Sequence, residues 1–160
     1  MKKRLLSAWV LLLCCAVNVL AQDKPSWVVE VEDVFKKKEP KWKIERIIVN
    51  GGVPIFSESI TFKSGGYRAN VHLTIWDSLK NAQDVLEAEI IAYESTRKSR
   101  VTKTRLENLG DENYMWPNLN RDGWTMIKFR KGTVIVRVFA PSVAMAKRFA
   151  QYVVERIPAG

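Results

Sequence analysis

The sequence predicts an α+β domain, built from an antiparallel sheet of about five to six strands with two or three helices packed on one face. Three observations predict this class. Apolar and polar residues alternate in several short segments, glycine-rich turns join neighbouring segments, and stretches with helical spacing precede, separate and follow two groups of strands. The expected order is α-βββ-α-β(β)ββ-α, where the brackets mark a strand whose presence the sequence pattern does not decide.

The composition fits a single domain. The chain has 160 residues, 47% of them hydrophobic and 27% charged, with a formal net charge of +9. The hydrophobic fraction excludes a disordered chain, and the length suits one domain or a domain with a short tail. We therefore expect one globular α+β domain over residues 22–160.

Residues 1–21 have the composition of a secretory signal peptide. Three basic residues at positions 2–4 precede an apolar run over 5–17, and the segment ends at Ala21 with residues suited to a signal peptidase. The apolar run is shorter than the ~20 residues that span a bilayer, which disfavours a transmembrane anchor. We predict export to the periplasm or the medium. A lipoprotein anchored through Cys15 (or through Cys14) is the alternative that the sequence leaves open.

Removal of this segment would take both cysteines away. The mature chain would have 139 residues, with 23 basic residues against 17 acidic ones and a net charge of +6. Without cysteine it forms no disulfide, and cysteine-based zinc sites, redox motifs and thiol nucleophiles are excluded. A hydrophobic core must therefore hold the fold, and the sequence predicts neither a metal nor another cofactor.

The first element after this segment is predicted to be a helix over 26–38. Trp27, Val31 and Phe35 recur at helical spacing, and acidic residues stand four positions before lysines, which is the stabilising order on a helix. An alternation of valine and glutamate in the same segment also suits a strand. We favour the helix, which ends before Pro40.

A three-stranded antiparallel meander is predicted next. Strands over about 42–49, 53–63 and 67–76 are joined by turns at 50–52 and 64–66, each of which contains two glycines. In the third strand apolar residues alternate with polar ones, which indicates one buried face and one face toward water.

The second half of the domain is expected to contain a helix, further strands and a closing helix. Ser78 suits the N-cap of an amphipathic helix, the basic stretch 95–105 is expected to be a surface loop that enters a strand, and a turn follows at 110–111. The remaining elements are a loop over 116–123, strands over about 124–130 and 133–139, and a helix over about 142–157.

Two segments, 62–86 and 129–153, share the pattern of strand, glycine turn, alternating strand, serine cap and helix. The match of the strands needs one inserted residue relative to the match of the helices. Duplication explains this similarity, and convergent patterning explains it about as well.

The sequence contains no recognisable catalytic constellation. His72 is the sole histidine and lies on the polar side of its predicted strand, so we expect it to face solvent; it cannot form a multi-histidine metal site. Asp111 and Glu112 follow Gly110, and we interpret them as a turn with a capping aspartate. A hydrolase that uses Asp111 and Glu112, with His72 as an optional third member, is the less favoured alternative, and it predicts that these side chains converge in one cleft.

Basic residues and one aromatic residue gather at the end of the first predicted helix and directly after it. Together with a second basic cluster in the loop 95–105, this pattern suits a polyanion such as an acidic glycan or an anionic lipid surface. The competing interpretation is a solvated surface with Trp42 packed in the core. Predicted export makes nucleic acid an unexpected partner. The lysines around Trp42 are Lys36, Lys37, Lys38, Lys41 and Lys43.

Three short motifs lie within residues 109–157. They are the turn Leu109-Gly110-Asp111-Glu112 with Tyr114, the hairpin Phe129-Arg130-Lys131-Gly132, and Ala146, Phe149 and Ala150 of the closing helix. In these residues the chain resembles small exported bacterial α+β domains such as the PknH-like extracellular sensor domains of serine/threonine kinases. The resemblance implies a domain for ligand sensing or interaction without catalysis. Those sensors usually carry disulfides, which the mature chain lacks.

The leading prediction is an exported, non-catalytic domain that binds a small ligand or an envelope protein on its sheet. The alternatives are an envelope protein that binds a polyanion or an anionic surface through segment 36–43 and, less favoured, a small hydrolase. The candidate binding residues are Lys36, Lys37, Lys38, Trp42, Lys43, Arg68, His72, Asp111, Tyr114 and Arg130.

Export is tested by the N-terminus of the expressed protein. In a Gram-negative bacterium the protein is expected to lose residues 1–21 and to begin at Gln22, because the basic and apolar regions direct it to a signal peptidase. Intact-mass measurement and N-terminal sequencing show the outcome. A chain that keeps Met1, or one that carries a lipid on Cys15, would contradict the prediction.

Overall fold

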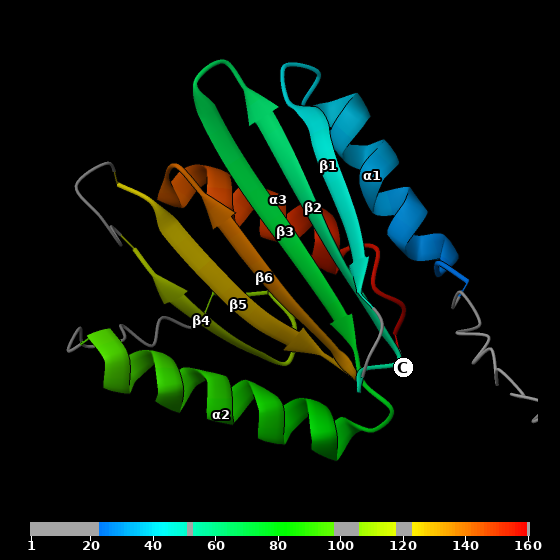
Figure 1. Ribbon diagram of the computed structural model, residues 1–160, viewed down its shortest axis with the longest axis vertical. Helices are drawn as coiled ribbons and strands as arrows, with labels where there is room; N and C mark the ends of the chain where they lie inside the picture. The colour runs from blue at the N-terminus through cyan, green and yellow to red at the C-terminus, as the bar shows by residue number, and fades with distance from the viewer. Residues whose placement is uncertain (1–22, 51–52, 98–105, 118–122, 160) are drawn as a thin grey trace, which may run out of the picture.

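The computed structural model describes residues 23–50, 53–97, 106–117 and 123–159, which form one sheet with helices on both faces (Figure 1). The predicted signal peptide, with both cysteines, lies outside these residues. The described elements follow the order α-βββ-α-βββ-α, which confirms the predicted class and order. The helices are α1 (Ser26–Lys38), α2 (Leu79–Arg97) and α3 (Val143–Val154), and the strands are β1 (Lys43–Asn50), β2 (Phe56–Ser64), β3 (Tyr67–Ile75), β4 (Glu112–Trp116), β5 (Thr125–Lys131) and β6 (Val134–Ala140).

The sheet consists of two antiparallel meanders that meet at its centre. The strand order is β1-β2-β3-β6-β5-β4, and every neighbouring pair is antiparallel. The first meander is the one that the glycine turns predict. The two meanders are joined by the pairing of β3 with β6, from Asn70 opposite Phe139 to Ile75 opposite Val134. β1 and β4 are therefore the edges of the sheet.

Helices α1 and α3 cover one face and form the main core. Val28, Val31 and Phe35 of α1 are fully buried at helical spacing, which is why this segment is a helix rather than a strand. The ring of Phe35 stacks on Phe62 of β2 with the centroids 4.4 Å apart, and it meets Phe149 of α3 edge-on at 4.7 Å.

Helix α2 lies on the opposite face. Its buried side chains form a second, smaller apolar cluster with β4, β5 and β6. The predicted placement of two or three helices on one face therefore holds for α1 and α3, and α2 adds a layer on the other side. The buried members of this cluster are Ala82, Leu86, Ile90, Trp116, Met126 and Ile135.

The length of the strand-to-helix linker accounts for this difference. β3 and β6 end at Ile75 and Ala140, whose side chains both pack on the α1 and α3 side. Three residues then precede α2, but two precede α3. Because successive residues of an extended chain face opposite sides, the additional residue turns the chain to the other face. This additional residue is the one that must be inserted when segment 62–86 is aligned with segment 129–153. The two halves therefore agree in the order of their elements but not in the face on which the helix lies.

Part of the face that carries α2 remains open. The helix packs against β5 and β6, and in Figure 1 it lies beneath β4, at the side of the sheet away from β1. Over β2 and β3 the same face presents Ser59, Thr61, Asn70 and Thr74, all partly exposed. This is the wet face that the alternation in the third predicted strand indicates.

A cluster of ionised groups ties the start of the described chain to the core. Glu58 of β2 is fully buried, and its carboxylate lies 2.8 Å from Nζ of Lys24. Lys24 also contacts the carboxylate of Glu32 on α1. Burial raises the pKa of Glu58, although Lys24 acts in the opposite direction. Burial lowers the pKa of Lys24, but its bonds to the two carboxylates outweigh this effect and raise it.

Lys24→Met is expected to lower the free energy of unfolding at neutral pH by about 3 kcal/mol, because it leaves two buried carboxylates without a cation. The loss should shrink toward about pH 5. A raised pKa means that native Glu58 takes up a proton more readily than the unfolded chain, so its contribution to stability grows as the pH falls. Urea denaturation at the two pH values measures the effect.

Lys36→Met is the matched control. Lys36 is exposed on α1 and pairs with Asp33, so its replacement should change the free energy of unfolding by no more than about 0.5 kcal/mol. A loss for Lys24→Met that is the same at both pH values would contradict the role assigned to Glu58.

Candidate functional site

The open part of the polar face contains a hollow at the end of the sheet where β2 turns into β3. It has a volume of about 410 Å³, and we call it the sheet hollow. Within it the indole of Trp124 stacks on Phe139 of β6, with the centroids 4.5 Å apart and the rings inclined by 21°. An aromatic platform is thus set into a polar sheet surface. The lining residues are Thr61, Gly66, Arg68, Ala69, Asn70, Trp124 and Phe139.

The polar edge of the sheet hollow is held by a small hydrogen-bond network. Nδ2 of Asn70 donates to Oγ of Ser59 at 2.8 Å and to Oγ1 of Thr61 at 3.3 Å. This fixes the Asn70 amide across β2 and β3. The hydroxyl proton of Thr61 and the amide oxygen of Asn70, two residues that line the hollow, can then bond to a bound molecule.

Arg68 is also fixed in orientation. Its Nε and Nη2 donate to the two carboxylate oxygens of Glu45 on β1, at 2.7 and 2.9 Å. This bidentate bond is the first cause of the lowered pKa of Glu45. A guanidinium carries five N–H groups, so Arg68 keeps donors for a ligand in the sheet hollow that it lines.

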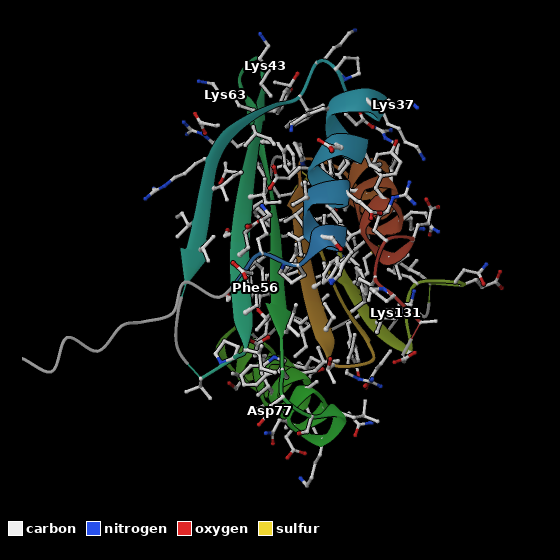
Figure 2. The ribbon with its side chains drawn as sticks, turned by 90° about the vertical axis from the view of Figure 1, so that its right-hand side faces the viewer. Lys37, Lys43, Phe56, Lys63, Asp77 and Lys131 are labelled. Atoms are coloured by element: carbon white, nitrogen blue, oxygen red, sulfur yellow. The ribbon has the colours of Figure 1, made fainter. Side chains whose placement is uncertain are left out.

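Three cations stand side by side across β1, β2 and β3 on this face. Lys43 pairs with Lys63, and Lys63 pairs with Arg68; we call these three residues the cationic row. Lys41 joins Lys43 and Lys63 in lining a second hollow of about 430 Å³, with Glu45, Ser64 and Gly65. Figure 2 shows Lys43 and Lys63 projecting together at one end of the molecule.

His72 lies farther along the same face, where α2 packs over the sheet. It pairs with Arg137 of β6, and its Nε2 is 3.1 Å from Oγ1 of Thr74. Burial and the nearby Arg137 lower the pKa of His72. The predicted solvent-facing histidine is therefore half-buried, because α2 covers it; a single strand pattern does not reveal which helix covers which stretch.

A buried lysine lies beside His72. Lys128 of β5 is 3% exposed and contacts Glu89 of α2, which Arg137 also approaches at 3.4 Å. Burial lowers the pKa of Lys128. The space among these side chains is about 20 Å³, roughly one water molecule. This cluster joins α2 to the sheet and offers no room for a substrate.

Asp111 and Arg130 form a structural clasp. Oδ2 of Asp111 accepts hydrogen bonds from Nη1 of Arg130 at 2.9 Å and from the backbone N–H of Gly132 at 2.8 Å. Nη1 of Arg130 also donates to the carbonyl of Gly132 at 3.0 Å. The aspartate thus ties the start of β4 to the β5–β6 turn, as expected of a capping aspartate, whereas Glu112 is the first residue of β4 and does not belong to the turn.

Glu112 and Tyr114 face an acidic groove between β4 and α2. The groove has a volume of about 470 Å³ and includes three acidic residues of α2. Tyr114 donates to Glu112, and burial together with this bond raises the pKa of Tyr114 to about 12. The acidic residues from α2 are Asp84, Glu87 and Glu94.

The predicted site residues do not form one site, although Glu112 links Tyr114 to the clasp, with its carboxylate 3.9 Å from Nε of Arg130. None of the four cavities described above is lined by His72 together with Asp111 or Glu112. Arg68 lies at the sheet hollow, and Arg130 belongs to the clasp. The hydrolase hypothesis predicts that Asp111, Glu112 and, optionally, His72 converge in one cleft, and none of these four cavities brings them together.

The basic segment 36–43 is likewise divided. Lys36 pairs with Asp33 at 3.1 Å, and Nζ of Lys38 lies 4.7 Å from the ring centroid of Tyr152. Lys37 lies on α1, apart from the cationic row (Figure 2).

Trp42 is 8% exposed and meets Phe149 edge-on at 5.7 Å, so it is a core residue. Of this segment, only Lys41 and Lys43 line a hollow among the described cavities.

The prediction missed Trp124, Phe139 and Lys63. The glycine turn at 65–66 carries enough information to find Lys63, because a two-residue hairpin places it opposite Arg68. Trp124 and Phe139 come together through the pairing of β5 with β6 and the loop that precedes β5. The sequence pattern contains no signal that predicts the contact between Trp124 and Phe139.

No group of three or more His, Cys, Asp and Glu side chains is placed to hold a metal within the described part of the chain. Among the same residues, no helix is both long and apolar enough to cross a membrane. Comparisons with known protein families, curated proteins and solved structures find no match for the chain.

Gly110→Ala tests the clasp. Gly110 has a φ of +69°, and a Cβ built on it would lie 2.3 Å from the carbonyl oxygen of Arg130. The replacement should lower the free energy of unfolding by roughly 2 kcal/mol or more. Gly66→Ala is the control, because its Cβ would meet nothing within 4 Å, and its effect should stay within about 0.5 kcal/mol. Thermal or urea unfolding compares the two variants, and equal changes in their free energy of unfolding would contradict the clasp.

Proposed function

We propose that this protein is a non-catalytic binding domain that holds a small ligand, or a short segment of a partner, in the sheet hollow. The observation that carries the proposal is the aromatic platform of Trp124 and Phe139 beside polar groups that are already oriented. Asn70 is fixed by Ser59 and Thr61, and Arg68 is fixed by Glu45. Groups that are oriented before binding lose little freedom when a ligand arrives, which favours affinity.

The ionisable groups elsewhere support binding rather than hydrolysis. Asp111 is engaged by Arg130 and by a backbone N–H, while His72 and Lys128 are packed under α2 with no space for a substrate. A general base needs hydrogen-bond access to the proton that it removes. None of the four cavities described above holds Glu112 together with Asp111 or His72, so the small-hydrolase alternative lacks the shared cleft that it predicts.

The proposed place of action is the cell envelope. This part of the proposal is supported by residues 1–21 alone, whose basic and apolar regions are typical of an export signal. The ligand would then be an envelope component or a molecule that enters the periplasm.

A second candidate function is the binding of an anionic surface or polymer. The cationic row favours it, because three positive side chains are adjacent across neighbouring strands. In this form the candidate uses Lys41 and Lys43 from the basic segment, together with Lys63 and Arg68 from the hairpin, rather than the lysines of α1.

A thermal-shift screen tests ligand binding. The protein, screened against periplasmic small molecules and envelope extracts, is expected to rise in melting temperature with at least one of them. Trp124→Ala should weaken the binding of that ligand by about 2 kcal/mol, because it removes one of the two rings of the platform.

Tyr67→Ala is the matched control. Tyr67 is an exposed aromatic residue on β3 whose strand position alternates with that of Arg68, so it faces the other side of the sheet. Its replacement should leave the shift unchanged. A screen without any shift, or a shift that survives in Trp124→Ala, would count against the sheet hollow as the binding site.

A further inference from the structure

We infer that the ligand of the sheet hollow is an acidic saccharide, with a sugar ring on the Trp124 platform and its anionic groups along the cationic row. The inference rests on the proposed function, since it names the ligand class of the same site. It also rests on an independent observation, the register of β1, β2 and β3.

The cationic row is electrostatically unfavourable in the ligand-free protein. Lys43, Lys63 and Arg68 occupy directly opposed positions on three adjacent strands, which lie about 4.8 Å apart. Like charges directly opposite one another on a sheet are destabilising. Glu45 offsets one of the charges, with its carboxylate 2.7 Å from Nε of Arg68 and 3.7 Å from Nζ of Lys63.

The remaining charge points to an anionic ligand. With Lys41, four cations surround one carboxylate, so about three positive charges stay uncompensated within this cluster. The side chains of Lys63 and Arg68 are 52% and 63% exposed, so their charged groups are open to an approaching molecule. An anionic group placed along the row would relieve the repulsion and gain charge-assisted hydrogen bonds.

The two hollows adjoin at the β2–β3 hairpin. Ser64 and Gly65 line the second hollow, beside Lys41, Lys43 and Lys63, while Gly66 and Arg68 line the sheet hollow. Arg68 belongs both to the cationic row and to the sheet hollow. A ligand that fills the sheet hollow therefore lies next to the row, and a chain-like ligand can occupy both.

The chemistry of the sheet hollow favours a sugar ring. The stacked pair of Trp124 and Phe139 offers an apolar surface for the C–H face of such a ring. Beside it stand a hydroxyl donor on Thr61 and an amide acceptor on Asn70, and sugar hydroxyls both donate and accept. Single-stranded nucleic acid is the less favoured class, because it stacks successive bases on several aromatic side chains. The described lining of this hollow has one platform.

A heparin-derived hexasaccharide is the probe, with binding followed by calorimetry at about 0.1 M salt, where long-range attraction is largely screened. The double variant Lys43→Gln/Lys63→Gln is expected to weaken binding at least ten-fold, because it removes two hydrogen-bonding cations. Trp124→Ala should also weaken it about ten-fold or more. Lys36→Gln/Lys37→Gln removes the same charge from exposed positions on α1, and it should leave the Kd within about two-fold.

Melting temperatures of all variants are measured first. Replacing Lys43 and Lys63 should not destabilise the fold, since it removes opposed like charges. An equal loss of affinity in the two double variants would overturn the inference, because the attraction would then come from net charge alone. Tighter binding of a ten-residue oligothymidylate than of the hexasaccharide would also overturn it.

Two further outcomes separate this inference from the proposed function. If the hexasaccharide fails to bind while another compound raises the melting temperature in a Trp124-dependent way, the proposed function stands and the inference is wrong. If binding requires Lys43 and Lys63 but is unchanged in Trp124→Ala, the row is an anion site separate from the hollow, and the inference is again wrong.

Discussion

The pairing of β3 with β6 is the contact on which the molecule depends. Among the described strands it is the only pairing between the two meanders, and it makes a single six-stranded sheet from two three-stranded ones. On one side it brings Val71 beside Val138 in the core that α1 and α3 cover. On the other side it sets Asn70 beside Phe139, so the polar and aromatic halves of the sheet hollow exist because this register exists.

This dependence explains how much of the fold could be predicted. Elements defined by neighbours in the chain were within reach of the sequence: α1 from its helical spacing, the first meander from its glycine turns, and α3 from its serine cap, whose Oγ accepts from the N–H of Met145. The side of the sheet that α2 covers depends on the linker after β3 and on a second apolar cluster formed by β4, β5 and β6. That cluster is assembled by tertiary contacts that local patterning does not contain.

The site shows the same division. Arg68 was identified because it stands on the wet side of an alternating strand, and strand periodicity reports that side directly. Trp42 was correctly given a core alternative, but the choice between core and surface needed Phe149 from the far end of the chain. His72, Asp111 and Glu112 have the right residue types for catalysis, yet His72 is packed under α2 and Asp111 is engaged in the clasp with Arg130. Residue type alone therefore suggests more catalytic chemistry than the protein can perform, because packing decides whether a substrate reaches these side chains.

The linkers after β3 and β6 carry a wider consequence. Helix placement here depends on whether the linker has an even or an odd number of residues. The two-residue linker keeps α3 on the face of the last core residue, and the three-residue linker places α2 on the opposite face. A single-codon insertion or deletion at such a point is thus an architectural change, whereas the same event in a long surface loop alters little. Two sequence halves with nearly identical patterns can in this way acquire unlike surroundings: α2 covers the polar face of β5 and β6, while the polar face of β2 and β3 stays partly exposed.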